Sequence, residues 1–127
     1  MAGRGASPGG RYSGTKSVLG NVVRVVVDVH PRGDPRHGVM DLSVSCSGGF
    51  VSFECPEEEW SLAKDDRQIE LVTDACWERF VQSNVQDLQM SFDSEANEIV
   101  LTGSRQISIF QLPVSMTLHW IGSAPIV

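Results

Sequence analysis

The feature that most constrains the fold is a strict alternation of apolar and polar residues on either side of a glycine pair. Apolar side chains occupy every second position over residues 40–46 and again over 51–55, and Gly48-Gly49 lies between the two runs. Alternation with a period of two is typical of a strand with one buried face, and two glycines supply the positive φ that a two-residue hairpin turn requires. The sequence therefore predicts an antiparallel hairpin, because a slip of one residue would turn every side chain to the other face. The register pairs Cys46 with Val51, Val44 with Phe53, Leu42 with Cys55 and Ser45 with Ser52.

Strand-like patterns recur along the rest of the chain. Residues 18–29 are rich in valine, and alternate valines from Val23 to Val29 share one face of a predicted strand that we expect to be covered on much of both faces. The prolines and glycines of residues 30–38 predict a connecting loop. Pro113 is expected to interrupt the later pattern. The remaining strands are predicted at 88–92, 99–101, 107–109 and 114–120, with turns at 93–97 and 103–104.

Two segments favour helices. Pro56 is followed by three glutamates, and both proline and carboxylates suit the first turn of a helix, so a short helix is predicted from here to Lys64. Residues 67–72 fit either a strand or a helix. Residues 73–83 carry apolar side chains at helical spacing and are predicted to form the main helix.

Together these elements predict an α+β fold. The short connections favour antiparallel neighbours, so we expect a twisted, mostly antiparallel sheet of about six or seven strands with the main helix packed on one face. Residues 1–17 contain glycine, serine and basic residues with almost nothing apolar, and they are predicted to form a flexible basic arm. Residues 18–127 then form a single α+β domain.

The cysteines and histidines show no spacing that is typical of a catalytic or metal site. Three cysteines are too few for a disulfide scaffold, so we expect reduced thiols in an intracellular protein, cytoplasmic or nuclear. The register separates Cys46 from Cys55 by roughly 13 Å, which is beyond disulfide reach. No apolar run approaches the roughly 18 residues of a membrane span. We therefore expect a protein that is not an enzyme, that binds no cofactor or metal and that has no membrane contact. The three histidines are His30, His37 and His119.

Two short motifs are similar to known binding sequences. Residues 9–17, GGRYSGTKS, resemble a phosphate-binding loop, but Thr15 intervenes before the lysine, and a strand rather than a helix is predicted to follow. Arg32-Gly33-Asp34 spells a tripeptide that some cell-adhesion receptors read, and its loop would expose it. The alternative is a tight turn in which Asp34 neutralises a neighbouring arginine.

Charge is distributed unevenly. Residues 1–38 hold six basic and two acidic residues, whereas residues 39–127 hold four basic and fourteen acidic residues. The concentration of acidic groups predicts an interaction or assembly module that presents an acidic face to a basic protein partner or to homologous subunits. The alternative is a structural subunit of a larger assembly whose arm contacts nucleic acid or a neighbouring subunit through Arg4, Arg11 and Lys16. The predicted acidic face, with Trp60 as an exposed anchor, consists of Glu57, Glu58, Glu59, Trp60, Asp65, Asp66 and Glu70.

Overall fold

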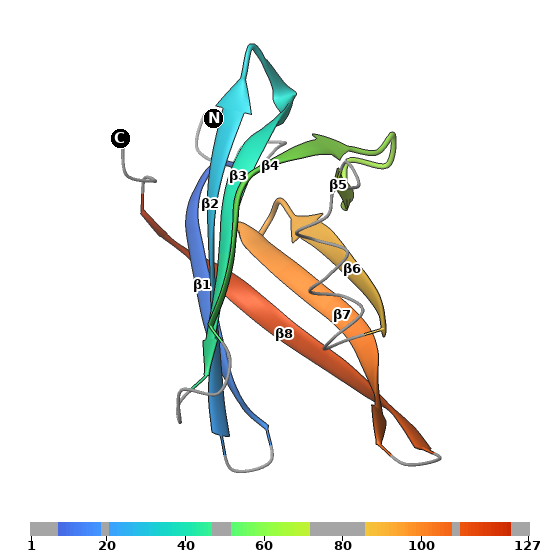
Figure 1. Cartoon of the computed structure of the whole chain (residues 1–127). Helices are drawn as coiled ribbons and strands as arrows, with labels where there is room; N and C mark the ends of the chain where they lie inside the picture. The colour runs from blue at the N-terminus through green and yellow to red at the C-terminus, as the bar shows by residue number, and fades with distance from the viewer. Residues whose placement is uncertain (1–7, 19–20, 47–51, 72–85, 108–109, 123–127) are drawn as a thin grey trace.

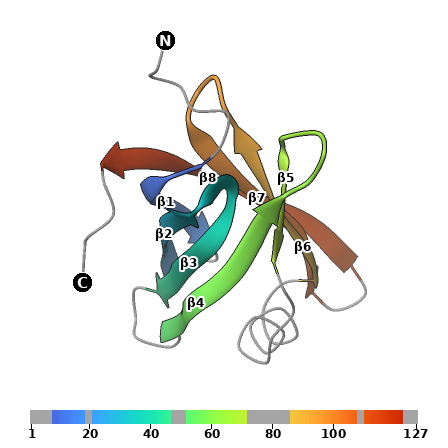
Figure 2. The same ribbon diagram turned by 90° about the horizontal axis from the view of Figure 1, so that it is seen from above.

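The protein is a closed barrel of eight antiparallel strands. This computed structural model describes residues 8–18, 21–46, 52–71, 86–107 and 110–122. Each strand pairs with the next along the chain, and the last strand returns to pair with the first (Figure 1). Seen from above, the strands form a ring around a common interior (Figure 2). The strands are β1 (Gly10–Val18), β2 (Asn21–Arg32), β3 (Asp34–Cys46), β4 (Ser52–Leu62), β5 (Gln68–Leu71), β6 (Gln86–Asp93), β7 (Glu98–Ile107) and β8 (Phe110–Gly122).

The α+β prediction is wrong, because the described residues form an all-β barrel without a helix. The meander of antiparallel neighbours is confirmed, but the sheet closes on itself instead of remaining open to a helix. The helix predicted at 73–83 lies outside the described residues. Within the described ranges, no helix is long and apolar enough to cross a bilayer.

The flexible arm is also wrong over residues 10–17, which belong to β1. This segment offers the core little more than Tyr12, but its backbone pairs with β2 from Gly10 opposite Val29 to Val18 opposite Asn21. Such a ladder satisfies the main-chain donors and acceptors of a polar strand, and Tyr12 itself is fully buried. Residues 1–7 lie outside the described part of the chain.

Closure of the barrel depends on a close approach between β1 and β8. Only Arg11 to Ser13 pair with β8 in register, and a bulge interrupts this ladder. Beyond it, a Cβ added at Gly14 would lie 2.4 Å from the carbonyl oxygen of Thr117, so the two strands come together where β1 has no side chain. Lys16 Nζ extends the contact by donating to the carbonyl oxygen of Ser115 at 2.7 Å.

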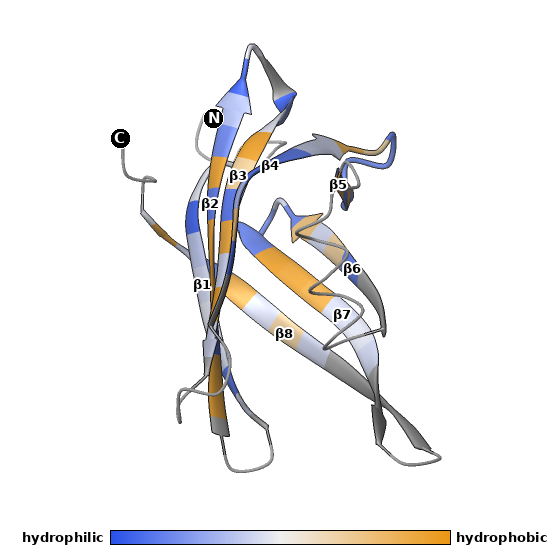
Figure 3. Ribbon diagram, in the orientation of Figure 1, coloured by the Kyte–Doolittle hydropathy of each residue, from blue (hydrophilic) through white to orange (hydrophobic). Residues whose placement is uncertain are grey.

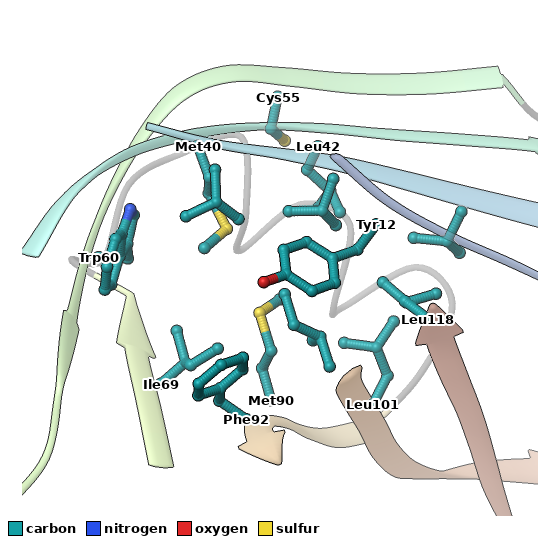
Figure 4. Packing of buried hydrophobic residues seen from close by; sticks show 14 of the residues in the cluster. Tyr12, Met40, Leu42, Cys55, Trp60, Ile69, Met90, Phe92, Leu101 and Leu118 are labelled. Carbon is teal, nitrogen blue, oxygen red and sulfur yellow. The ribbon is translucent and has the colours of Figure 1, made fainter. Parts of the chain in front are cut away.

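The core is the interior of the barrel. Hydropathy alternates along the strands (Figure 3), and buried side chains from opposite sides of the ring meet around Tyr12 (Figure 4). An eight-stranded barrel has an interior that side chains can fill. The predicted inward valine face of β2 is confirmed, whereas Val22 on its other face is 45% exposed, so that face is not covered throughout. The cluster comprises Tyr12, Val25, Val27, Val29, Met40, Leu42, Val44, Cys55, Trp60, Leu62, Ile69, Met90, Phe92, Ile99, Leu101 and Leu118.

The predicted β3–β4 hairpin register is confirmed where it is described, but the helix after it is wrong. Leu42, Val44 and Ser45 pair as predicted with Cys55, Phe53 and Ser52. Beyond Pro56, β4 continues as a strand, with a bulge in its pairing to β3 and a positive φ of 54° at Glu57. The turn itself, residues 47–51, lies outside the described residues.

Other boundaries also differ from the prediction. The expected loop at 30–38 is the tip of a hairpin, since β2 runs to Arg32 and β3 starts at Asp34. The strand predicted at 99–101 continues to Ile107 as β7, so the turn predicted at 103–104 is wrong, and Pro113 lies within β8 opposite Ser104. The turn before β7 is confirmed, and the ambiguous segment at 67–72 contains strand β5.

Candidate interaction surface

Two buried side chains of the barrel interior, Tyr12 and Trp60, form hydrogen bonds that support the fold. Tyr12 donates its hydroxyl hydrogen to Asn97 Oδ1 at 2.7 Å and accepts from the Gly9 amide at 3.1 Å. Burial raises the pKa of the Tyr12 hydroxyl above its ordinary value. Trp60 donates from Nε1 to the Val39 carbonyl oxygen at 3.1 Å. These hydrogen bonds offset the cost of burying polar groups, and they give each of these side chains a structural role.

Two members of the predicted acidic face point into the barrel. Glu58 and Trp60 are each only 1% exposed, so neither can contact a partner on the surface. Both lie on the inward face of β4, where Glu58 is opposite Met40 and Trp60 is opposite Gly38. The signal that sequence reasoning missed is the spacing of Glu58, Trp60 and Leu62, which resumes the period of two after the bulge, with the inward positions shifted by one residue. A glutamate at one of the inward positions concealed it.

Of the two tryptophans that the structure describes, Trp120 is the exposed one and Trp60 is buried. The alternation of β8 predicts a buried Trp120, yet the residue is 47% exposed. It lies next to the end of β1, where its Nε1 donates to the carbonyl oxygen of Gly9 at 3.1 Å. Trp77 lies outside the described residues.

Three of the predicted acidic residues remain as exposed carboxylates on the outer wall of the barrel. Glu57 and Glu59 extend from β4 and Glu70 from β5, and we call these three the acidic surface. The register places Glu70 opposite Ser61, two residues along β4 from Glu59. None of the three carboxylates forms a hydrogen bond or an ion pair within the described part of the chain. Their charge is therefore available to a partner.

Asp65 and Asp66, by contrast, stabilise the turn between β4 and β5. Asp65 Oδ1 accepts from the amides of Arg67 and Gln68 at 2.9 and 3.0 Å, and these hydrogen bonds, the one to Gln68 first, lower the pKa of the Asp65 carboxyl. Asp66 forms an ion pair with Arg36. Arg36 also donates to the carbonyl oxygen of Ala63 at 2.7 Å, which ties this turn to β3.

The cations assigned to the arm act within the barrel wall. Arg11 forms two hydrogen bonds with Asp28, at 2.7 and 2.9 Å, and this bonding raises the pKa of Arg11. Lys16 is bonded to β8 through Ser115. Arg4 lies outside the described residues. Neither Arg11 nor Lys16 extends on a free tail.

Cys55, His30 and His119 lie on three different strands, β4, β2 and β8. Cys55 is disulfide-bonded, which contradicts the expectation of a reduced thiol there and removes the cysteine argument for an intracellular protein. His30 Nε2 lies 3.5 Å from Asp41, and His119 Nδ1 lies 2.7 Å from Glu98. Across the part of the chain that the structure describes, no three His, Cys, Asp or Glu side chains are grouped to hold a metal ion.

Comparison of the chain with protein-family models, with curated proteins and with solved structures finds no match. The function is therefore inferred from the residues and their geometry alone.

Proposed function

We propose that this protein is a non-enzymatic interaction module that binds a basic protein partner through the acidic surface of β4 and β5. The observation that carries the proposal is the set of three exposed carboxylates, Glu57, Glu59 and Glu70, which no described cation neutralises. Asp41, whose side chain is 43% exposed, borders them and accepts a hydrogen bond from the Glu57 amide.

The physical basis is electrostatic. Glu59 lies diagonal to Glu70, whose direct partner is Ser61, so the two like charges repel each other and contribute no stabilising pair to the sheet. A concentrated negative field attracts a basic surface, speeds its association and excludes acidic surfaces and nucleic acid. Binding through this surface should weaken as salt is added, because exposed charges are screened.

The alternative, a structural subunit that contacts nucleic acid through a basic arm, has less support. It needs Arg11 and Lys16 on a mobile segment, whereas both lie on β1 and are bonded to Asp28 and Ser115.

Affinity capture from native extract tests the proposal. The wild-type chain and a triple variant, Glu57→Gln, Glu59→Gln and Glu70→Gln, are used as baits, and the dissociation constant of each basic protein recovered is then measured. Exposed ion pairs contribute about 0.2–1 kcal/mol each, so each substitution should weaken binding roughly 1.4- to fivefold. Glu95→Gln is the matched control, because Glu95 is an exposed carboxylate in the turn between β6 and β7. A basic partner that binds the triple variant as tightly as the wild type would refute the proposal.

A further inference from the structure

The Arg32-Gly33-Asp34 tripeptide occupies the apex of the β2–β3 hairpin. Strand β2 ends at Arg32 and β3 begins at Asp34, so Gly33 alone reverses the chain, and the two flanking residues are Cα partners. Gly33 has a φ of 72°, a conformation that glycine adopts without steric cost. The tip of this hairpin stands clear of the other strands at the top of Figure 1.

The apex is open to solvent and its arginine is unengaged. Pro31, Arg32 and Gly33 are all exposed, and a Cβ added at Gly33 would meet no atom within 4 Å. The Arg32 guanidinium forms no hydrogen bond or ion pair within the described part of the chain. Arg36, in contrast, is bonded to Asp66 and to backbone carbonyls in the turn between β4 and β5.

The hairpin is also held in shape. Below the apex β2 and β3 come so close at Gly38 that an added Cβ would lie 2.1 Å from the His30 carbonyl oxygen and 2.8 Å from Pro31 Cα. The ring of Pro31 restricts the φ angle of that residue. Arg36 joins the base of the hairpin to the turn between β4 and β5 through its hydrogen bond to Ala63. A segment that is ordered before binding loses less conformational entropy when it binds, so this turn is preorganised for recognition.

We propose that the Arg32-Gly33-Asp34 turn is recognised by a cell-adhesion receptor that presents a divalent cation beside an acidic pocket. Carboxylate oxygens are preferred ligands of Mg²⁺ and Ca²⁺, which is the role of Asp34. A guanidinium makes bidentate hydrogen bonds with carboxylates, which is the role of Arg32 in the acidic pocket. Gly33 lets the receptor backbone approach closely, since it has no side chain.

The disulfide at Cys55 agrees with this proposal, because disulfides persist in oxidising surroundings such as the cell exterior, where such receptors act. The hairpin apex lies on β2 and β3, and the acidic surface lies on β4 and β5. Recognition of the apex is therefore independent of the function proposed above, and variants of the two surfaces separate them.

The test measures binding of the immobilised full chain to the purified ectodomain of an Arg-Gly-Asp-binding adhesion receptor in the presence of Mg²⁺. We expect saturable binding that is abolished by EDTA and displaced by a soluble Arg-Gly-Asp peptide. Both of these measurements use the wild-type chain, so they do not depend on the folding of a variant. Absence of binding, on a surface where an immobilised Arg-Gly-Asp peptide binds the same ectodomain, would overturn the proposal.

Conservative variants then assign the contact to individual side chains. Asp34→Glu keeps the charge but moves the carboxylate by one methylene, and Arg32→Lys keeps the charge but removes the bidentate geometry. Each should weaken binding by at least about 30-fold, the factor that corresponds to the ~2 kcal/mol lower bound for breaking a buried charged contact. The matched controls are Glu95→Asp and Arg24→Lys, exposed residues away from the apex that should bind as the wild type does. Equal binding by the apex variants and the controls would show that the tripeptide is not the recognised element.

Discussion

Replacing Gly14 with alanine should weaken the seam at which β8 returns to β1 and closes the barrel. The added Cβ would lie 2.4 Å from the Thr117 carbonyl oxygen and 2.9 Å from Leu118 Cδ2. The nearer obstacle is backbone, so β1 and β8 must separate rather than one side chain rotate. The ladder of Cα partners between these strands covers Arg11 to Ser13, directly beside the Gly14 contact.

The expected loss follows from two opposing effects. Overpacking a close contact costs about 1–3 kcal/mol. Alanine also restricts the unfolded chain, which returns about 0.4–1 kcal/mol where the native backbone accepts it. We therefore expect Gly14→Ala to lower the free energy of unfolding by about 1–2 kcal/mol, which corresponds to a fall in Tm of roughly 4–8 °C for a chain of this size.

Equilibrium unfolding in urea, followed by tryptophan fluorescence, measures this difference. Gly9→Ala is the matched control, because its added Cβ would meet only Pro31 Cγ at 3.6 Å, an ordinary van der Waals contact. Gly9→Ala should leave the free energy of unfolding unchanged or raise it slightly. If Gly14→Ala unfolds at the same urea concentration as Gly9→Ala, the close approach of β1 and β8 does not close the barrel.

Two further predictions concern Tyr12 and Cys55. Tyr12 is the single tyrosine of the chain, and burial raises its pKa, so in the folded protein its phenolate absorbance should appear at a pH above the ordinary 10.0 and in denaturant at the ordinary value. Because the pKa of Tyr12 is higher in the folded protein, the buried neutral hydroxyl makes a contribution to the free energy of unfolding that is fully present below the unfolded pKa. This contribution is lost as the pH rises through the folded pKa, and Tyr12→Phe should not show this loss of stability at alkaline pH. Peptide mapping without reductant should find Cys55 joined to Cys76, because Cys46 lies four residues beyond Leu42, the partner of Cys55, or roughly 13 Å along the ladder. A Cys46–Cys55 peptide would contradict that register.

The two errors in β4, the predicted helix and the exposed Trp60, share one origin. Pro56 and the glutamates after it carry local helix signals worth at most about 1 kcal/mol each. Burying the side chains of Trp60 and Leu62 contributes about 1.5–3 kcal/mol each, and only a strand directs both of them inward. Tertiary burial therefore outweighs local preference in β4, and it makes Trp60 a core residue instead of a surface anchor.

Within the candidate interaction surface, the sequence correctly located the carboxylates of Glu57, Glu59 and Glu70 in one acidic segment, but not the face on which each residue lies. Glu58 differs from its neighbours only in being at an inward position of the strand. Composition cannot distinguish residues of one type, whereas the direction of each side chain depends on which strand lies beside it.

The sequence by itself determined what is periodic over a few residues: the register of the β3–β4 hairpin, the inward face of β2 and the antiparallel meander. Each follows from alternation along one strand and a short connection to the next. Only the tertiary structure decided that β1 is a strand and that it meets β8, because this contact joins residues more than a hundred positions apart. A polar segment such as β1 has no hydrophobic pattern that would predict a strand. Its position is set by backbone hydrogen bonds to its neighbour β2 and to the distant β8.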